Sequence, residues 1–491
     1  MSDTTSITPR RAKDATSAAT SAPGSPDTNS DAKPPRSWKA TLARITNTTW
    51  LTSLLAVVVA LVVGAILIAA ADSGVQASAK YLFARPGDFF GALGHSVGGA
   101  YASLFQGAVF NISSSYTVAD FVHPLTNTVS YSVPLIFAGL ALGIGFRAGL
   151  FNIGAQGQIV MGATLSAFVG FTWHLPPGLH LIACLLAAFI GGAIWGFVPG
   201  ILKALTGANE VIVTIMLNSV AVYLLSYLLT LPAFRSPGSF MPISPAVDAS
   251  ARFPHFFGSA IDLGFVLALV AAFAVWWLME RSTLGFRIRA VGESNDAART
   301  AGMSVPAAYV WVMVIAGGLA GLASTSQLLS GSSQQLNGDI ASTFGFDAIT
   351  VALLGRSKPV GTVLAGLLFG GLRAGGYIMQ SSTGTPIDII LVLQSVIVLL
   401  IAAPPLVRAI FRLPDPDKRA KVKTSRRHEV ATVAATQPIA TVESTAAAQP
   451  VGAVASEEVV ESDSPGEAPT DAGPGDTDDT VLAPSETEAQ S

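Results

Sequence analysis

Charged residues are scarce in this chain. Of its 491 residues, 12% are Asp, Glu, Lys or Arg, and 51% are hydrophobic. Soluble globular domains carry about 25% charged residues. The shortage excludes an ordinary soluble protein, and apolar runs of about 20 residues predict a protein that lies in the lipid bilayer.

Several chemical signatures are also missing. The single cysteine, Cys184, excludes an internal disulfide and lies in an apolar run. No cluster of His, Cys and carboxylates has the spacing of metal ligands, and no Ser, His and Asp arrangement suggests a nucleophile. The phosphate-binding pattern G-x-x-x-x-G-K-S/T does not occur. We therefore expect no catalytic residue and no metal or cofactor site in this chain, and no ATP hydrolysis by it.

Basic residues are missing from the end of the chain, where no Lys or Arg follows Glu429. The segments before Trp38 and after Leu413 are polar, and such segments cannot bury enough apolar surface to offset the entropy of ordering. We predict disordered cytoplasmic tails at 1–37 and 413–491, the second one acidic, around a transmembrane domain at 38–412. The basic stretch Lys418–Arg427 predicts contact with anionic lipid rather than nucleic acid.

The apolar runs predict an all-α, polytopic membrane protein with about ten transmembrane helices. The predicted spans are 50–71, 128–146, 153–173, 179–201, 210–230, 260–279, 306–330, 341–357, 359–380 and 385–404. The stretch 93–110 is only mildly apolar and is left open as an interfacial or re-entrant helix. Clusters of glycine in the spans, such as Gly191, Gly192 and Gly196, predict close helix packing.

Basic residues set the orientation, because they collect in cytoplasmic loops. With the N-terminus inside, the loops outside hold only Lys80, Arg85, Arg235 and Arg252. Both termini are then cytoplasmic, which requires an even number of spans. Spans one to five and six to ten start in opposite orientations, so the topology is compatible with a 5+5 inverted repeat around a transport pathway.

The cytoplasmic loop at 281–305 reads "RSTLGFRIRAVGESNDAARTAGMSV". Its second half predicts a short helix, with Ser294 or Asn295 as the N-cap, Asp296 in the first turn and Gly302 at the end. A short cytoplasmic helix of this kind suits contact with a partner protein. The alternative is an amphipathic connector on the lipid surface.

The stretch "GFRIRAVGESNDAARTAG" resembles the corresponding loop of permeases in ATP-binding-cassette importers for ribose, galactose, nucleosides and branched-chain amino acids. Three more stretches resemble the nucleoside and simple-sugar branch: "GLFNIGAQGQIVMGA", "NEVIVTIMLNSVAVYLL" and "GFDAITVALLGRSKPVGTVLAGLLFGGLRAGG". The resemblance covers residues 125–405 in the same order. One departure is Gln156, where many relatives have Glu.

The resemblance implies that the loop docks in a groove of a separate ATP-binding subunit, which uses ATP and Mg. It also implies a second permease subunit, similar or identical, an extracytoplasmic substrate-binding lipoprotein, and a location in the cell membrane of a prokaryote. The residues that we assign to the contact with the ATP-binding subunit are Gly285, Arg287, Arg289, Gly292, Glu293, Ala297, Ala298, Arg299 and Gly302.

The resemblance implies import of nucleosides or related simple sugars. Two alternatives stay open. One is a permease for branched-chain amino acids or another sugar, and the other is a secondary transporter driven by an ion gradient. Transport by this chain alone, without an ATPase, would identify the second.

Polar side chains at membrane depth need a partner or a pathway, because they are costly in lipid. Asp347 and Arg373 are predicted at similar depth in two consecutive spans, where they would pair, either as structural partners or in contact with substrate. Asn152, Gln156 and Gln158 surround a Gly-containing junction between spans, where amides bind substrate hydroxyls or cap the backbone. We assign to the candidate substrate pathway Asn152, Gln156, Asn218, Asp347 and Arg373.

Overall fold

The computed structural model describes residues 49–111, 118–256, 261–330 and 334–412. Contacts between Cα atoms divide the chain into two units, Met1–Ala420 and Lys421–Ser491. The predicted tails, the second unit and the basic stretch Lys418–Arg427 lie outside the described residues. The fold described below is therefore that of the first unit.

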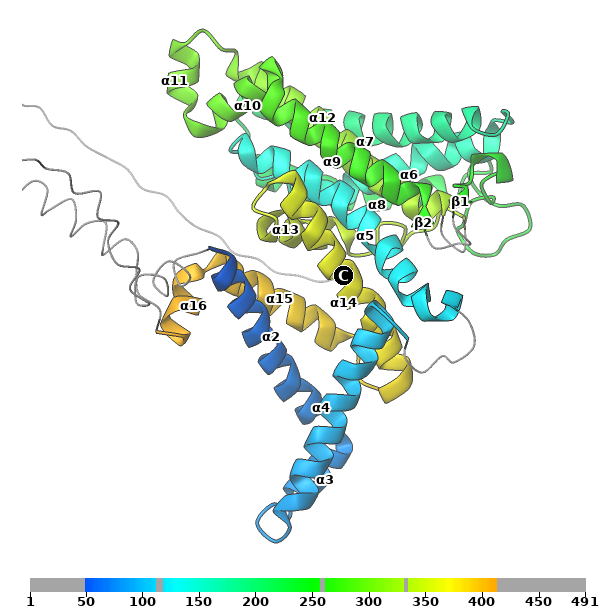
Figure 1. Ribbon diagram of the computed structural model, residues 1–491. Helices are drawn as coiled ribbons and strands as arrows, with labels where there is room; N and C mark the ends of the chain where they lie inside the picture. The colour runs from blue at the N-terminus through cyan, green and yellow to red at the C-terminus, as the bar shows by residue number, and fades with distance from the viewer. Residues whose placement is uncertain (1–48, 112–117, 257–260, 331–333, 413–491) are drawn as a thin grey trace, which may run out of the picture. The chain divides into compact units, whose positions relative to one another are not determined.

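The described part of the chain is helical, as predicted, apart from one 3-10 turn (Ala249–Ala251) and one antiparallel pair of short strands, β1 (His255–Phe256) and β2 (Ile261–Asp262). The helices in chain order are α2 (Thr49–Ala71), α3 (Ser73–Ala79), α4 (Pro86–Ala108), α5 (Val118–Arg147), α6 (Ala155–Thr172), α7 (Leu179–Thr206), α8 (Glu210–Leu228), α9 (Leu263–Arg281), α10 (Thr283–Glu293), α11 (Asn295–Thr300), α12 (Val305–Leu329), α13 (Phe344–Leu354), α14 (Pro359–Thr383), α15 (Asp388–Ala402) and α16 (Pro404–Ile410). Figure 1 labels them.

Each of the ten predicted spans coincides with a helix, but fewer helices are long and apolar enough to cross a membrane. Among the described residues six qualify: residues 123–147 of α5, and α7, α8, α9, α12 and α14. A seventh results if α2 and α3, which meet at a bend of 78°, form one broken span. The 11-residue α13 measures only about 16 Å at 1.5 Å per residue, roughly half the thickness of the hydrocarbon core.

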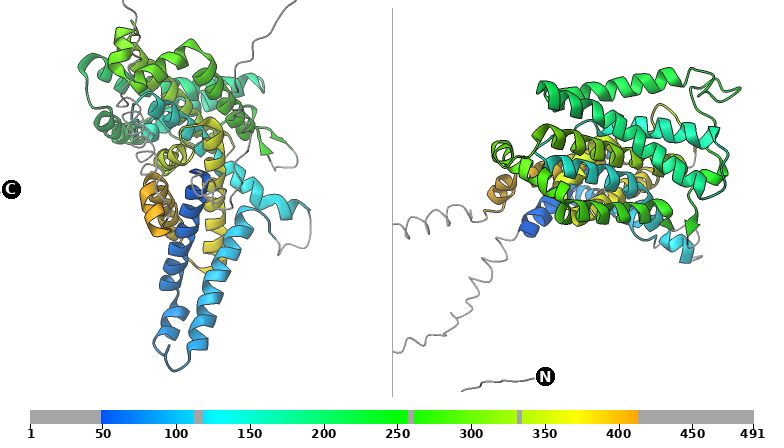
Figure 2. Two further views of the ribbon diagram at one scale, coloured as in Figure 1. Left: turned by 60° about the vertical axis from the view of Figure 1, so that its left-hand side comes forward. Right: turned by 90° about the horizontal axis from the view of Figure 1, so that it is seen from above.

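The segment left open at 93–110 lies within α4, a 23-residue helix with Pro86 in its first turn. This helix packs on α14 and α2. Its last carbonyl, at Ala108, accepts a 2.6 Å hydrogen bond from Thr128, and a Cβ on Gly375 would lie 2.2 Å from the carbonyl oxygen of Leu104. Figure 2 shows α2, α3 and α4, in blue, running beside one another. Main-chain contact with α14 fixes the position of this weakly apolar segment.

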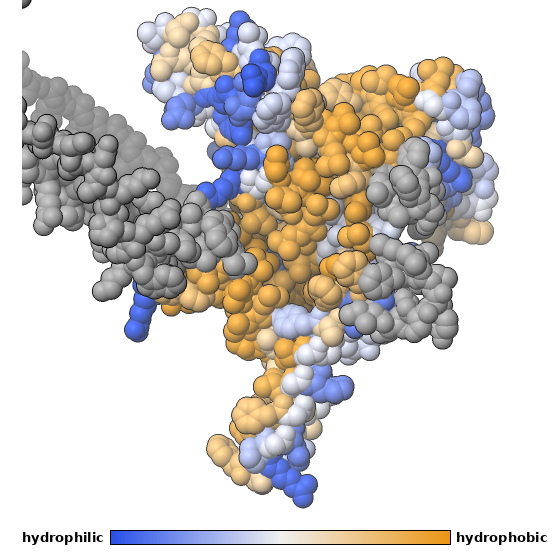
Figure 3. All heavy atoms as spheres, viewed as in Figure 1, coloured by the Kyte–Doolittle hydropathy of each residue, from blue (hydrophilic) through white to orange (hydrophobic). Residues whose placement is uncertain are grey.

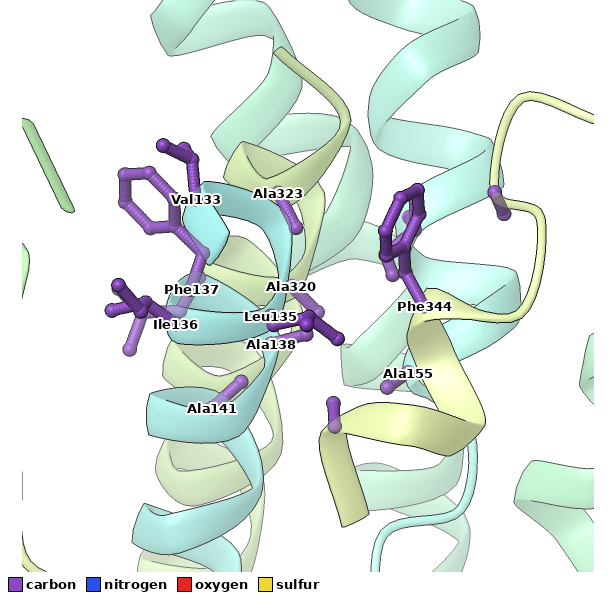
Figure 4. Close-up of a cluster of buried hydrophobic side chains, with 14 of the residues drawn as sticks. Val133, Leu135, Ile136, Phe137, Ala138, Ala141, Ala155, Ala320, Ala323 and Phe344 are labelled. Carbon is purple, nitrogen blue, oxygen red and sulfur yellow. The ribbon is translucent and has the colours of Figure 1, made fainter. Parts of the chain in front are cut away.

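The core lies between α5, α6, α7, α12, α13 and α14. Figure 4 shows Leu135 and Ala138 of α5 beside Ala320 of α12, with Phe344 of α13 across from them. The contact between α7 and α12 depends on glycine, as predicted: a Cβ on Gly192 would lie 2.1 Å from the carbonyl oxygen of Gly317. Such contacts allow two helix backbones to touch.

Exposed apolar side chains cover the outer faces of the spans. They include Ile182 and Leu186 of α7 and Val270 and Phe273 of α9. Figure 3 shows a broad hydrophobic surface over the bundle, while hydrophilic residues gather at α10 and α11. A surface of this kind suits contact with lipid acyl chains, and the hydrophilic α10–α11 end suits contact with water.

Candidate functional site

Two groups of residues bear on function: the helix pair α10–α11 at one end of the bundle (Figure 1) and a set of polar side chains within it. The loop at 281–305 forms both helices of the pair. The predicted helix over its second half is confirmed as α11, where the hydroxyl of Ser294 accepts from the N–H of Ala297 at 3.3 Å. Gly302 follows α11 with a φ of +75°, a conformation that favours glycine.

Helix α10, in the first half of the loop, was not predicted. The hydroxyl of Ser282 caps it by accepting from the N–H of Gly285 at 2.9 Å. The buried positions Gly285, Ile288 and Val291 then follow at a spacing of three, which places them on one face. The cap residue and this spacing are the sequence signals that would have revealed the helix.

The pair has an inward and an outward face, and the nine residues assigned to the contact with a partner divide between them. On the inward face, Gly285 and Ala298 are buried, and Gly292 and Arg289 are half-buried. The exposed members of the set are Arg287, Glu293, Ala297, Arg299 and Gly302. Phe286, which the sequence analysis missed, is 57% exposed on this outward face. An exposed aromatic side chain beside charges is typical of a protein interface.

The inward face of α10 touches its neighbours through glycine. A Cβ on Gly285 would lie 2.0 Å from the carbonyl oxygen of Leu278 in α9. A Cβ on Gly292 would lie 2.1 Å from the carbonyl oxygen of Arg147, the last residue of α5. Neither distance is possible without movement of the backbone. The helix is therefore fixed to α9 at one end and to α5 at the other.

A cluster of three charges joins the same three helices. Glu280 of α9 lies 2.9 Å from Arg147 of α5 and 3.1 Å from Arg289 of α10. Arg289 also donates to the carbonyl oxygen of Met279. The side chains of Arg147, Glu280 and Arg289 are 18%, 44% and 35% exposed. Ion pairs this exposed contribute about 1 kcal/mol or less each, so the cluster sets orientation more than stability.

Beyond Arg147 the chain breaks helical geometry before α6 begins at Ala155. Amide side chains satisfy the backbone at this junction. Asn152 accepts from the N–H of Gly154 at 2.9 Å and donates to Gln158 at 3.1 Å. Asn218 of α8 accepts from the N–H of Gly157 at 2.9 Å and donates to the carbonyl of Ile153 at 3.0 Å. These contacts are the backbone capping that stood as the alternative to substrate binding for Asn152.

Gln156 connects the start of α6 to the start of α13. Its Nε2 donates to the carbonyl oxygen of Ser342 at 2.6 Å, and its Oε1 accepts from the N–H of Gly345 at 3.1 Å. An ionised carboxylate can accept but not donate. This geometry gives a physical reason for an amide at the position where the resemblance leads one to expect Glu.

The predicted contact between Asp347 and Arg373 is confirmed, with an N–O distance of 3.2 Å. Arg373 also donates to the hydroxyl of Thr343 at 3.1 Å and of Ser342 at 3.0 Å, and its guanidinium lies 4.4 Å from the ring centre of Phe344. Thr343 in turn donates to Asp347 at 2.8 Å. From the sequence, Ser342 and Thr343 fall inside the predicted span 341–357, and their hydroxyls were not assigned to the pathway. The structure places both residues before α13, where they contact Arg373.

Two aromatic side chains lie near this network. Tyr377 follows Arg373 by about one helical turn in α14 and stacks on Tyr131 of α5, with ring centres 5.6 Å apart.

Glu210 forms an ion pair with Lys203 at 2.8 Å at the start of α8. Among the residues that the structure describes, no group of three or more His, Cys, Asp or Glu side chains could hold a metal ion.

Comparison with known proteins gives a consistent result. A family model described as "Branched-chain amino acid transport system / permease component" matches residues 125–402. The guanosine ABC transporter permease protein NupP of Bacillus subtilis is 36% identical over 312 residues, which are 63% of this chain and 87% of that protein. The glucose ABC transporter permease protein TsgB13 of Haloferax volcanii is 35% identical over 288 residues, 56% of this chain and 75% of that protein.

A third relative is the nucleoside ABC transporter permease protein NupB of Lactococcus lactis subsp. cremoris. It is 31% identical over 278 residues, 55% of this chain and 76% of that protein. No solved structure matches the chain.

Proposed function

The chain belongs to the family of branched-chain amino acid transport system permease components, as a permease subunit of an ATP-binding-cassette importer, and on that premise we propose that it imports nucleosides. It is a transport component rather than an enzyme. The relatives named for guanosine and for nucleosides support this substrate class, and the relative named for glucose supports simple sugars as the second candidate. All of these solutes present sugar hydroxyls.

The outward face of α10–α11 is the structural observation that supports import driven by a separate ATPase. It presents Phe286, Arg287, Glu293 and Arg299 to the surface on the side that basic residues assign to the cytoplasm. A separate ATP-binding subunit, which uses ATP and Mg, docks on this face. Charged residues around an aromatic anchor give such an interface orientation and specificity.

The remaining partners follow from the family. A second permease subunit completes the pathway, and an extracytoplasmic binding lipoprotein delivers the substrate. The protein lies in the cell membrane with both termini in the cytoplasm. Asp347, Arg373 and Gln156 lie at the start of α13 or contact it, so they line or shape the pathway there. The rings of Tyr131 and Tyr377 would suit a flat nucleobase.

Uptake measurements test the substrate. Cells or proteoliposomes that contain the complete importer should accumulate labelled guanosine, and unlabelled nucleosides should compete. Competition by glucose with none by nucleosides would assign the chain to sugars, and competition by leucine alone would assign it to branched-chain amino acids. Uptake by the purified chain with an ion gradient and no ATPase would refute the proposal.

A co-purification assay tests the docking face. Arg287→Glu combined with Glu293→Lys should reduce recovery of the ATP-binding subunit, because both charges lie on the exposed face. Lys80→Glu, which changes an exposed charge on the other side of the membrane, is the matched control. Equal recovery from the double variant and the control would show that the subunit docks elsewhere.

A further inference from the structure

The inward face of α10 has no part in the proposed contact with the ATP-binding subunit, yet it holds the closest contacts of the whole loop. Gly292 meets the carbonyl of Arg147 so closely that no Cβ fits between them. Gly149, two residues after Arg147 in the chain, has a φ of +70°. A Cβ on Gly149 would lie 3.5 Å from the carbonyl oxygen of Gly292. The end of α10 and the end of α5 are thus in main-chain contact.

The charge cluster supplies a second connection at the same place. Glu280 contacts the side chains of both Arg147 and Arg289, so it holds the ends of α5, α9 and α10 together. A displacement of α10 cannot be absorbed by rotation of side chains at Gly292, because glycine has none. It must move the end of α5 instead, since close-packed interiors transmit strain.

The end of α5 leads to the pathway residues through a short segment in which the backbone of Ile153 and Gly154 is hydrogen-bonded to Thr214, Asn152 and Asn218. From Arg147 the chain reaches Gln156, which holds the carbonyl of Ser342 and the N–H of Gly345 at the start of α13. Ser342 and Asp347 then contact Arg373 of α14. A continuous series of main-chain contacts and hydrogen bonds therefore runs from the cytoplasmic helix pair to the polar network in the membrane.

We propose that Gly292 and the Arg147–Glu280–Arg289 cluster are positioning residues that transmit movement of the α10–α11 pair to the α5–α6 junction, and through Gln156 to α13. This inference rests on the proposed function, because the ATP-binding subunit proposed there is what would move the α10–α11 pair. The loop thereby has two tasks on two faces: the outward face binds the partner, and the inward face moves the pathway.

The test measures two properties of the complete importer: the recovery of the ATP-binding subunit and the number of substrate molecules transported per ATP. In complexes that retain the ATP-binding subunit, Gly292→Ala should lower the number of substrate molecules transported per ATP by about tenfold, within the range of typical coupling energies. Gly94→Ala is the matched control, because a Cβ at this helical glycine meets nothing within 4 Å. Unchanged transport per ATP in complexes that retain the ATP-binding subunit would overturn the inference.

Arg147→Gln and Glu280→Gln provide a second test that adds no volume to the contact. Each single variant should lower transport per ATP, and the double variant should lower it no further than the more severe single variant, because the two side chains act through one contact. Independent, multiplicative losses would contradict the proposed role. If no ATP-binding subunit co-purified with the wild-type chain, the proposed function itself would be refuted, and neither test of this inference would be needed.

Discussion

Removing Arg373 should harm the protein more than removing its partner Asp347. Arg373 has three other contacts, to the hydroxyls of Ser342 and Thr343 and to the ring of Phe344. Among the described residues, Asp347 has one further side-chain contact, the hydroxyl of Thr343. The side chains of Asp347 and Arg373 are 18% and 15% exposed.

The contacts give the expected magnitudes. Arg373→Gln leaves a mostly buried carboxylate with one donor, and loss of one partner from a buried pair costs about 3–5 kcal/mol. Asp347→Asn keeps an acceptor for Thr343 and leaves Arg373 with its other three contacts, so the loss is one charged hydrogen bond, about 1.5–3 kcal/mol. The double variant removes both charges and should resemble Arg373→Gln or be milder.

Thermal unfolding of the purified protein in detergent, together with substrate uptake, provides the assay. The midpoint should fall furthest for Arg373→Gln and less for Asp347→Asn. In the double variant it should fall by less than the sum of the two. A fully additive loss, or a greater loss for Asp347→Asn, would refute the reasoning, because the two residues would then not share one network.

Three further predictions concern single contacts. Gln156→Glu removes the donor to the carbonyl of Ser342 and should lower stability by about 1–3 kcal/mol. The variant should therefore have a lower midpoint of thermal unfolding than the wild type. Gly192→Ala places a methyl group against the carbonyl of Gly317 and should cost about 1–3 kcal/mol, read in the same assay. Asp72→Ala removes the N-cap of α3, which accepts from Val75 at 2.9 Å, and should cost about 1 kcal/mol, visible as faster hydrogen exchange in α3.

Matched changes separate these effects from nonspecific damage. Asp72→Asn keeps a cap oxygen and should exchange like the wild type. Gly94→Ala should leave the unfolding midpoint unchanged, because space is open there. If Gly192→Ala proved as mild as Gly94→Ala, the close contact between α7 and α12 would not be important for stability.

The positions of the long apolar helices could be predicted from the sequence, because spans in lipid require long apolar runs. The number of full spans could not. An apolar run such as that around α13 does not reveal that Ser342 and Thr343 stop the helix short and turn their hydroxyls toward Arg373. The length of a helix at membrane depth depends on tertiary hydrogen bonds that a hydropathy pattern does not contain.

The pairing of Asp347 with Arg373 was predictable from depth alone, since each charge in lipid needs a partner. The two faces of the helix pair were not. Gly285 and Gly292 belong to the same motif as Arg287 and Glu293, and only the structure shows that the glycines face the chain's own α9 and α5. A motif records which residues are needed, but it does not record on which side each one is needed.

The contact between α7 and α12 limits where the transporter can change shape. Gly192, Gly196, Gly317 and Gly321 bring the two main chains together over about two turns, so neither helix can slide or tilt against the other without a steric clash. The two helices must travel as one rigid body. Hinge motion is then left to elements joined by side chains and hydrogen bonds, above all the half-length α13, whose beginning Gln156 holds with two bonds.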